Sequence, residues 1–202
     1  PAGQPVFHCH GLPGSRLEPE LLHPSALEHG LRVIGFDRPG YGGTAPLPGR
    51  RVGDEVTDVR AIADRLALEH FDVLGFSGGG PHALACAAHL PERVDRVSLV
   101  ASWAPFREAP RDGMADALRQ LWHLAEQDFD TFGDTLADAI GQAGGPYEML
   151  LGGAPDEDRQ ILQRPAIAAT YRESGLEAMR QGMTGMLEDA RAAIAEWTFP
   201  VD

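Results

Sequence analysis

The sequence predicts an α/β fold in which a mostly parallel central sheet is flanked by helices. Apolar stretches of strand length alternate with helical patterns along the first half of the chain, which is typical of β-α-β units. These stretches are mostly continuous apolar runs, as expected for parallel strands covered on both faces. The second half carries only helical patterns, so we expect a helical elaboration on the sheet.

Four strands are predicted, at residues 5–10, 31–36, 71–75 and 94–101. Helices are predicted between them, at residues 17–29, 54–69 and 81–90. The second of these has apolar residues three and four positions apart, which form one helical face. They are Val56, Val59, Ile62 and Leu66. The third opens with Pro81, and proline is favoured in the first turn of a helix.

Five helical segments are predicted in the second half of the chain. They lie near residues 112–127, 128–143, 156–163, 167–181 and 183–196. Glycine- and proline-containing loops separate some of them. These loops contain Gly144-Gly145-Pro146 and Gly152-Gly153-Ala154-Pro155. A run of helices after an α/β stretch indicates an insertion or a subdomain.

The composition is that of a soluble globular protein and excludes several classes. The 202 residues are 43% hydrophobic and 23% charged, which excludes a largely disordered chain. Seventeen basic residues, all Arg, against 30 acidic ones give a net charge of −13, which argues against a nucleic-acid partner. No apolar run has the length of a membrane span and no signal peptide is visible, so we expect a cytoplasmic protein without a membrane partner. Cys9 and Cys86 lie in apolar stretches and are expected to be buried free thiols.

A serine lies on a glycine-rich turn between the third predicted strand and the helix after it. The segment Gly75-Phe76-Ser77-Gly78-Gly79 has the spacing of a nucleophile elbow. Such a turn lifts the serine hydroxyl above the sheet, and it requires small residues such as Gly75 and Gly79 two positions away. The N–H of Gly78 begins the helix and is suited to stabilise negative charge. A phosphate-cradling loop is the alternative, which is disfavoured because no G-K-[ST] segment follows.

A second glycine-bearing loop, His10-Gly11-Leu12-Pro13-Gly14, directly follows the first predicted strand. An oxyanion hole needs two backbone donors from separate loops, and the N–H of Leu12 is the most plausible second donor. The alternative is a simple tight turn.

Together these two loops and the segment Asp37-Arg38-Pro39-Gly40-Tyr41-Gly42 resemble the α/β-hydrolase fold superfamily, in its capped serine-hydrolase branch with an H-G-x-P-G loop. The resemblance implies a partial α/β-hydrolase core at residues 1–104, a helical cap at 105–196 and a return toward the core at 197–202.

The resemblance also assigns roles to residues. Ser77 would be the nucleophile and Leu12 and Gly78 the oxyanion donors, with Asp37 organising its turn. The elbow and loop would be supported by Gly75, Gly79, His10 and Gly11. Serine rather than aspartate at the elbow argues against epoxide hydrolases and haloalkane dehalogenases, and Leu12 disfavours peptidase action. The expected activity is cleavage of a carboxylic ester, thioester, lactone or amide bond through an acyl-enzyme.

Serine needs a general base and an orienting acid, and the family places both after the nucleophile. The candidate bases His82, His89 and His123 fit this role poorly, since the first two lie on the helix that leaves the elbow. The candidate acids are equally weak; they are Glu108, Asp112 and Asp202. We therefore expect the acid and the histidine beyond Asp202, and we expect the 202 residues to be part of a longer chain. The alternative is a non-catalytic or degenerate ligand-binding member of the fold.

The substrate pocket of capped family members lies between cap and sheet. Its strongest candidate lining residues are Trp103, Phe106 and Trp122. The methionines of the helical part are further candidates, although methionine at helical spacing is more often core; they are Met149, Met179, Met183 and Met186. An apolar lining suits a small, neutral, hydrophobic acyl substrate, with no cofactor or metal. The sequence does not define the oligomeric state.

Overall fold

A four-stranded parallel sheet forms the centre of the molecule. The computed structural model describes residues 3–105 and 113–200. The strands are β1 (Gln4–Cys9), β2 (Leu31–Gly35), β3 (Phe71–Phe76) and β4 (Val94–Val100), and they lie in the order β2-β1-β3-β4. All three pairings are parallel, and His8 pairs with Gly35 on one side and Leu74 on the other. The predicted α/β class and all four predicted strands are confirmed.

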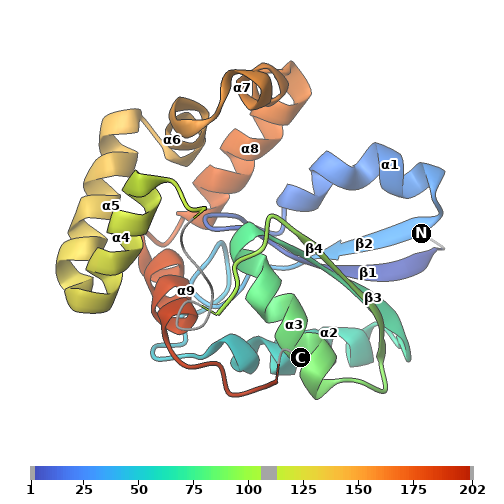
Figure 1. Cartoon of the computed structure of the whole chain (residues 1–202). Coiled ribbons are helices and arrows are strands. Elements are labelled where there is room, and N and C mark those ends of the chain that lie inside the picture. The colour runs from blue at the N-terminus through green and yellow to red at the C-terminus, as the bar shows by residue number, and fades with distance from the viewer. Residues whose placement is uncertain (1–2, 106–112, 201–202) are drawn as a thin grey trace.

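Helical segments connect consecutive strands. Between β1 and β2 lie η1 (Glu18–Leu22) and α1 (His23–Glu28), and between β2 and β3 lie η2 (Val52–Asp54) and α2 (Glu55–Arg65). Between β3 and β4 lie η3 (Ser77–Gly79) and α3 (Gly80–His89). Figure 1 shows α1 on one face of the sheet and α2 and α3 on the other. The helices predicted in these three connections are therefore present.

Six helices form the second half of the described chain. They are α4 (Asp116–Gln127), α5 (Phe129–Ala143), α6 (Pro146–Gly153), α7 (Asp156–Leu162), α8 (Pro165–Ala178) and α9 (Thr184–Ile194). In Figure 1, α4 to α8 gather at one end of the sheet. Helix α9 lies between the pair formed by α4 and α5 on one side and the α/β part on the other. Both α4 and η2 contact α9. No helix of the described residues is long and apolar enough to cross a membrane.

One helix was not predicted. This is α6, whose sequence predicts only loops, because one glycine pair precedes the segment and another ends it. The helix forms because Pro146 occupies its first turn and Tyr147 is buried, with 3% of its surface exposed. The Tyr147 hydroxyl donates to the Leu162 carbonyl at 2.9 Å, which fixes α6 against the segment that precedes α8.

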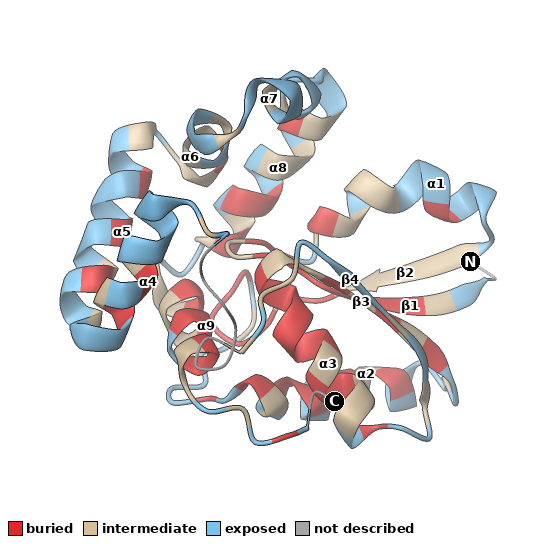
Figure 2. Cartoon of the chain, in the orientation of Figure 1, coloured by how far each residue is buried: buried red, intermediate tan, exposed pale blue. Residues whose placement is uncertain are grey.

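Two hydrophobic clusters hold these layers together. The sheet cluster lies between the strands, α2 and α3 and includes Phe7, Phe71 and Cys86. The helical cluster joins Trp122 and Phe132 to Tyr41 and residues of α9. Figure 2 shows the buried residues concentrated on α3 and α9, and buried residues of the sheet lie on β1 and β3, whereas α7 has no buried residue. Cys9 and Cys86 are buried free thiols, as predicted.

Candidate active site

The turn after β3 is tight and has a left-handed backbone at Ser77. Ser77 has a φ of +50°, a left-handed conformation that residues other than glycine rarely adopt. A Cβ atom at Gly79 would lie 2.0 Å from the Cys9 carbonyl oxygen, and one at Gly75 would lie 2.7 Å from the Gly80 Cα atom. The close packing of β3, the turn and α3 therefore requires glycine on both sides of Ser77.

Leu12, Gly78 and Trp103 come together beside Ser77. A Cβ atom at Gly78 would lie 2.9 Å from Leu12 Cβ and 3.1 Å from the Trp103 ring. The backbone N–H of Trp103 donates a hydrogen bond to the Ser77 carbonyl at 3.4 Å. The structure thus brings the loop after β1, the turn after β3 and the segment after β4 to one edge of the sheet, where the carboxyl ends of parallel strands meet.

The glycine loop after β1 is fixed by buried polar groups. One carboxylate oxygen of Glu18 accepts a hydrogen bond from the Gly11 N–H at 2.9 Å. The same oxygen lies 2.7 Å from His8 Nε2. The Ser15 N–H donates to Ser174 Oγ of α8 at 3.1 Å. The loop is therefore held both from η1 and from the helical part of the molecule.

His10 is buried and neutral. Burial of the ring, followed by the positive charge of Arg38, holds the pKa of His10 well below its usual value. The neutral ring donates from Nδ1 to the Gly11 carbonyl at 2.9 Å and accepts from the Arg38 N–H at Nε2, at 3.4 Å. The His10 and Tyr41 rings make a T-shaped contact, with their centroids 4.8 Å apart. These contacts leave His10 in a structural role for the loop.

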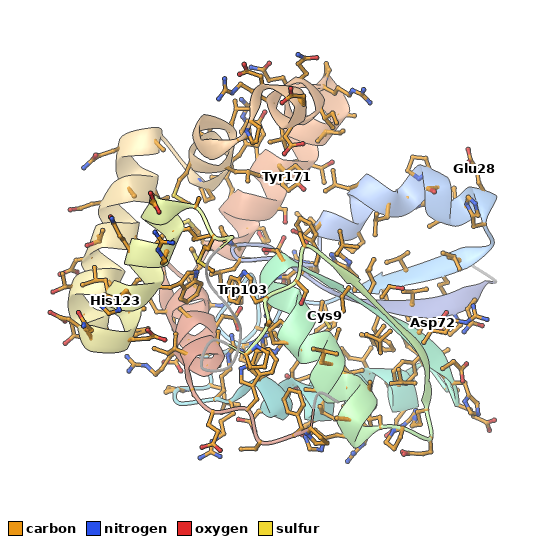
Figure 3. All side chains as sticks on the ribbon, viewed as in Figure 1. Cys9, Glu28, Asp72, Trp103, His123 and Tyr171 are labelled. Carbon is orange, nitrogen blue, oxygen red and sulfur yellow. The ribbon has the colours of Figure 1, made fainter. Side chains whose placement is uncertain are left out.

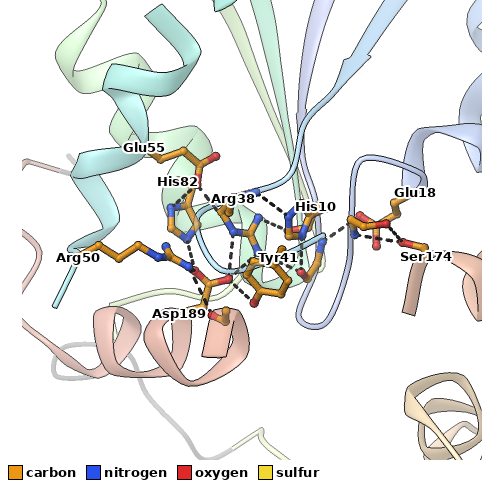
Figure 4. A network of polar contacts seen from close by, with 12 residues as sticks. His10, Glu18, Arg38, Tyr41, Arg50, Glu55, His82, Ser174 and Asp189 are labelled. Atoms are coloured by element: carbon orange, nitrogen blue, oxygen red, sulfur yellow. Dashed lines mark hydrogen bonds and ion pairs between the residues drawn. The ribbon is translucent and has the colours of Figure 1, made fainter. Parts of the chain in front are cut away.

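A buried ionic network lies beside this loop and contacts it through Arg38 (Figure 4). We use this name for Arg38, Tyr41, Arg50, Glu55, His82 and Asp189. Asp189 of α9 is its centre. Its carboxylate accepts from Arg38 at 2.7 Å, from the Tyr41 hydroxyl at 2.6 Å and from Arg50.

The charges of this network compensate one another. Burial alone would raise the pKa of Asp189, but Arg38 and Arg50 outweigh it and hold the pKa well below the usual value. Burial alone would raise the pKa of Glu55 too. The nearby charges outweigh it and lower this pKa, and the largest contribution comes from the His82 ring, 2.8 Å away. Both carboxylates are therefore ionised inside the protein, where unpaired charges would be costly.

The described histidines that follow Ser77 all have other surroundings. His82 lies in the buried ionic network between Glu55 and Asp189. His89 is exposed at the end of α3 and contacts the Phe199 ring, and His123 is exposed on α4, well away from Trp103 (Figure 3). Within residues 3–105 and 113–200, no histidine is hydrogen-bonded to Ser77. Glu108, Asp112 and Asp202, the candidate acids, lie outside the described residues.

The expected pocket residues occupy different environments. Trp103 is half-buried beside Gly78 and contacts Trp122 edge-on with ring centroids 4.9 Å apart. Trp122 itself is buried and stacks on Phe132. Met186 is buried in the helical cluster, and the three other methionines named as candidates pack against that cluster; they are Met149, Met179 and Met183. Phe106 lies outside the described residues.

Sequence reasoning did not single out the buried ionic network. Charged residues ordinarily remain at the surface, and these are scattered from position 38 to position 189. One signal was present in the sequence. Asp189 lies three residues after Met186 and four before Ala193, so a carboxylate interrupts the apolar face of α9. Asp37 accepts from the N–H groups of Arg16 and Gly43, as expected of a residue that organises its turn.

Comparison with known proteins places this geometry in a family. The sequence profile of the alpha/beta hydrolase fold matches residues 4–146. The chain is 30% identical over 110 residues to the uncharacterized hydrolase YcgS of Bacillus subtilis, covering 54% of this chain and 38% of that protein. It is 35% identical over 105 residues to a non-heme chloroperoxidase of Streptomyces lividans, covering 51% of this chain and 38% of that one.

A solved structure extends the similarity beyond the sheet. The esterase EaEST from Exiguobacterium antarcticum is 25% identical and superposes with a TM-score of 0.59, covering 96% of this chain and 67% of the esterase. The chain spans 38% of the length of each of the two curated relatives. The profile covers well over half of the chain, including the glycine loop, the elbow and all four strands. The chain therefore belongs to the alpha/beta hydrolase fold family.

Proposed function

We propose that this protein is a serine hydrolase that cleaves a carboxylic ester, thioester, lactone or amide bond through an acyl-enzyme on Ser77. The observation that carries the proposal is the left-handed backbone of Ser77 at the strand-to-helix turn, with Gly78 facing Leu12 beside it. The names of relatives, which include a hydrolase and an esterase, support the general class of reaction.

In the proposed reaction, Ser77 Oγ attacks the substrate carbonyl carbon while a general base removes the hydroxyl proton. The carbonyl oxygen becomes an oxyanion, which accepts hydrogen bonds from the N–H groups of Leu12 and Gly78. Collapse of this intermediate breaks the bond to the leaving group, which takes up the proton from the base. Water, deprotonated by the same base, then attacks the acyl carbon. The bond between this carbon and Ser77 Oγ breaks, Oγ takes the proton back from the base, and the carboxylic acid is released.

Two features of the elbow favour this chemistry. Gly78 lies in the first turn of the helical segment that begins at Ser77 and continues into α3, so its N–H lies at the positive end of the helix dipole. Trp103 presents apolar surface beside Gly78, which suits a small, neutral, hydrophobic acyl group. We place the substrate next to Trp103, with its carbonyl oxygen between Leu12 and Gly78.

The second candidate function is ligand binding without catalysis. One observation favours it: of the histidines described here, those after Ser77 are held in the buried ionic network or exposed on α3 and α4. Without a general base, serine is a weak nucleophile. The two candidates differ in whether Ser77 reacts.

Covalent labelling separates the two. The full-length protein would be incubated with a fluorophosphonate probe, and the labelled peptide would be located by mass spectrometry. We expect a single adduct on Ser77, no adduct in Ser77→Ala, and unchanged labelling in Ser98→Ala, which removes an exposed serine of β4. Folded wild-type protein that takes up no label and hydrolyses no p-nitrophenyl ester would favour the ligand-binding function.

A further inference from the structure

The carbonyl groups of the glycine loop are held by a single buried arginine. Arg38 Nη1 donates to the His10 carbonyl at 2.6 Å, and Arg38 Nη2 donates to the Gly11 carbonyl at 3.0 Å. The Gly11 carbonyl also accepts from His10 Nδ1 at 2.9 Å. The oxygen of the peptide between Gly11 and Leu12 is therefore held by two side chains, Arg38 and His10. Figure 4 shows both side chains beside the loop.

Fixing this oxygen also fixes the N–H of Leu12. A trans peptide unit is planar, and its C=O and N–H groups point in opposite directions. With the Gly11 oxygen directed at Arg38, the Leu12 N–H is directed away from it, on the side of the loop opposite the buried ionic network. Rotation of this peptide would break both hydrogen bonds to its oxygen. We propose that Arg38 is a positioning residue that aims the Leu12 N–H into the oxyanion hole, an inference that rests on the proposed function.

Arg38 is in turn held by α9. Its Nε and Nη2 atoms donate to one oxygen of Asp189 at 3.0 and 2.7 Å, so all three guanidinium nitrogens are used. Both side chains are completely or almost completely buried. Tyr41 donates its hydroxyl to the same carboxylate oxygen and packs its ring against His10. Asp189 thus transmits the position of α9 to the glycine loop.

The geometry requires arginine in particular. The planar fork of the guanidinium group reaches two carbonyls and a carboxylate at once. A lysine at this position would keep the positive charge but would offer a single nitrogen, which cannot satisfy the three acceptors in the same way. Arg38→Lys therefore separates the effect of the charge from the effect of the fork.

The test compares Arg38→Met and Arg38→Lys with Arg50→Met in the full-length protein. Arg50 is a matched control, because it is also buried and binds the same Asp189 but donates to neither loop carbonyl. The measurements are kcat and KM for p-nitrophenyl acetate, the rate of Ser77 labelling by a fluorophosphonate, and thermal unfolding. Loss of one oxyanion donor typically lowers kcat by about 10²- to 10³-fold. We expect a loss of that order in both Arg38 variants, with KM unchanged, and a kcat close to wild type in Arg50→Met.

The outcomes separate this inference from the proposed function. If Arg38→Lys is more stable than Arg38→Met but has an equally low kcat, the guanidinium fork positions the loop as proposed. If the folded Arg38 variants lose no more kcat than Arg50→Met, or if Arg38→Lys restores kcat together with stability, Arg38 is only structural and the inference is wrong. Should Arg38→Met fail to fold, the comparison of Arg38→Lys with Arg50→Met decides. An unlabelled, inactive wild-type protein would instead overturn the proposed function.

Discussion

At the scale of single residues, the elbow depends on the absence of side chains around Ser77. Gly79 lies so close to β1 that a Cβ atom would be 2.0 Å from the Cys9 carbonyl oxygen and 2.6 Å from that of His10. These are backbone atoms of the strand and loop, which cannot move aside as the end of a flexible side chain can. The left-handed φ of Ser77 is therefore maintained by packing on both sides of the turn.

Gly79→Ala should consequently destabilise the fold. We expect a loss of about 1–3 kcal/mol or more in the free energy of unfolding, as is typical of overpacking in a close-packed interior. Urea denaturation would measure the loss. The variant should also lose Ser77 labelling, because relief of the clash moves the turn away from β1.

Gly141→Ala is the matched control for this substitution. Gly141 lies inside α5 and is exposed, and apart from the backbone of its own helix no atom lies within 4 Å of the position of an added Cβ. Alanine there should stabilise the protein by roughly 0.5–1 kcal/mol, because glycine is unfavourable inside helices. Equal effects of the two substitutions would show that packing at Gly79 does not support the elbow.

At the scale of secondary-structure elements, the two outer strands of the sheet differ. β2 is half-buried along its whole length and contacts α1, whereas most of β4 is exposed. Leu99 and Val100 of β4 are 44% and 50% exposed. No other described strand pairs with the free edge of β4. An exposed apolar edge strand offers unpaired backbone groups to another chain.

We expect the 202-residue chain to self-associate through this edge, and we expect Leu99→Lys to weaken the association. Sedimentation velocity at several protein concentrations would measure it. Because Leu99 is largely exposed, the substitution should change the free energy of unfolding by no more than about 0.5 kcal/mol.

Leu176→Lys provides the control. Leu176 is 69% exposed, but it lies on α8, where the backbone groups are bonded within the helix. It should leave the association unchanged. Equal effects at the two leucines would indicate association through general hydrophobicity, and a monomeric wild-type chain would contradict the prediction outright.

The strands and most helices were predictable because each has a strong local pattern. The four strands are short apolar runs bounded by turn residues, and the G-x-S-x-G spacing marks the elbow whatever the rest of the chain does. α6 was missed because Gly152 and Gly153 disfavour a helix locally, while burial of Tyr147 against the rest of the molecule favours it. Local propensity is a weak guide where such tertiary contacts decide.

The candidate site was predictable only in part, for the same reason. The loops that hold Leu12 and Gly78 carry their own sequence patterns. The residues that hold those loops do not, since Arg38 and Asp189 are ordinary surface residue types until the fold brings them together. The placement of Trp103 beside Gly78 likewise depends on the pairing of β4 with β3.

At the scale of the whole molecule, the buried ionic network joins the two halves of the chain. Glu55 begins α2, His82 lies on α3 and Asp189 lies on α9, so one cluster ties the sheet layer to the end of the helical part. Figure 2 shows that these segments are among the most buried in the molecule. The stability of the whole fold should therefore follow the protonation of this cluster.

His82 provides the test of this dependence. Burial lowers the pKa of its ring and Arg38 opposes protonation, but the Glu55 carboxylate, together with Asp189, outweighs them and raises the pKa above 6.5. A raised pKa means that protonated His82 stabilises the fold fully below pH 6.5, and that this contribution is lost as the pH rises through the raised value. The difference in unfolding free energy between wild type and His82→Gln should be largest below pH 6.5 and should shrink above it, as measured by urea titrations across pH.

Glu55→Gln supplies the control for this experiment. Glu55 is the main group that raises the pKa of His82, so its neutralisation should move the pH dependence of the difference to lower pH. Asp189, Arg38 and Arg50 remain charged in both backgrounds. A difference that grows with rising pH would show that His82 is neutral in the folded protein.

The hydrogen bonds between Arg38 and Asp189 also constrain the order in which the protein folds. The two residues are 151 positions apart in the chain. During synthesis the strands and α3 leave the ribosome first, and Arg38 then has no carboxylate from α9 to bind. Long-range contacts of this kind form late, because the entropy of closing the intervening loop must first be overcome. The glycine loop would thus acquire its final geometry only when α9 is in place, and a nascent chain would remain inactive until then.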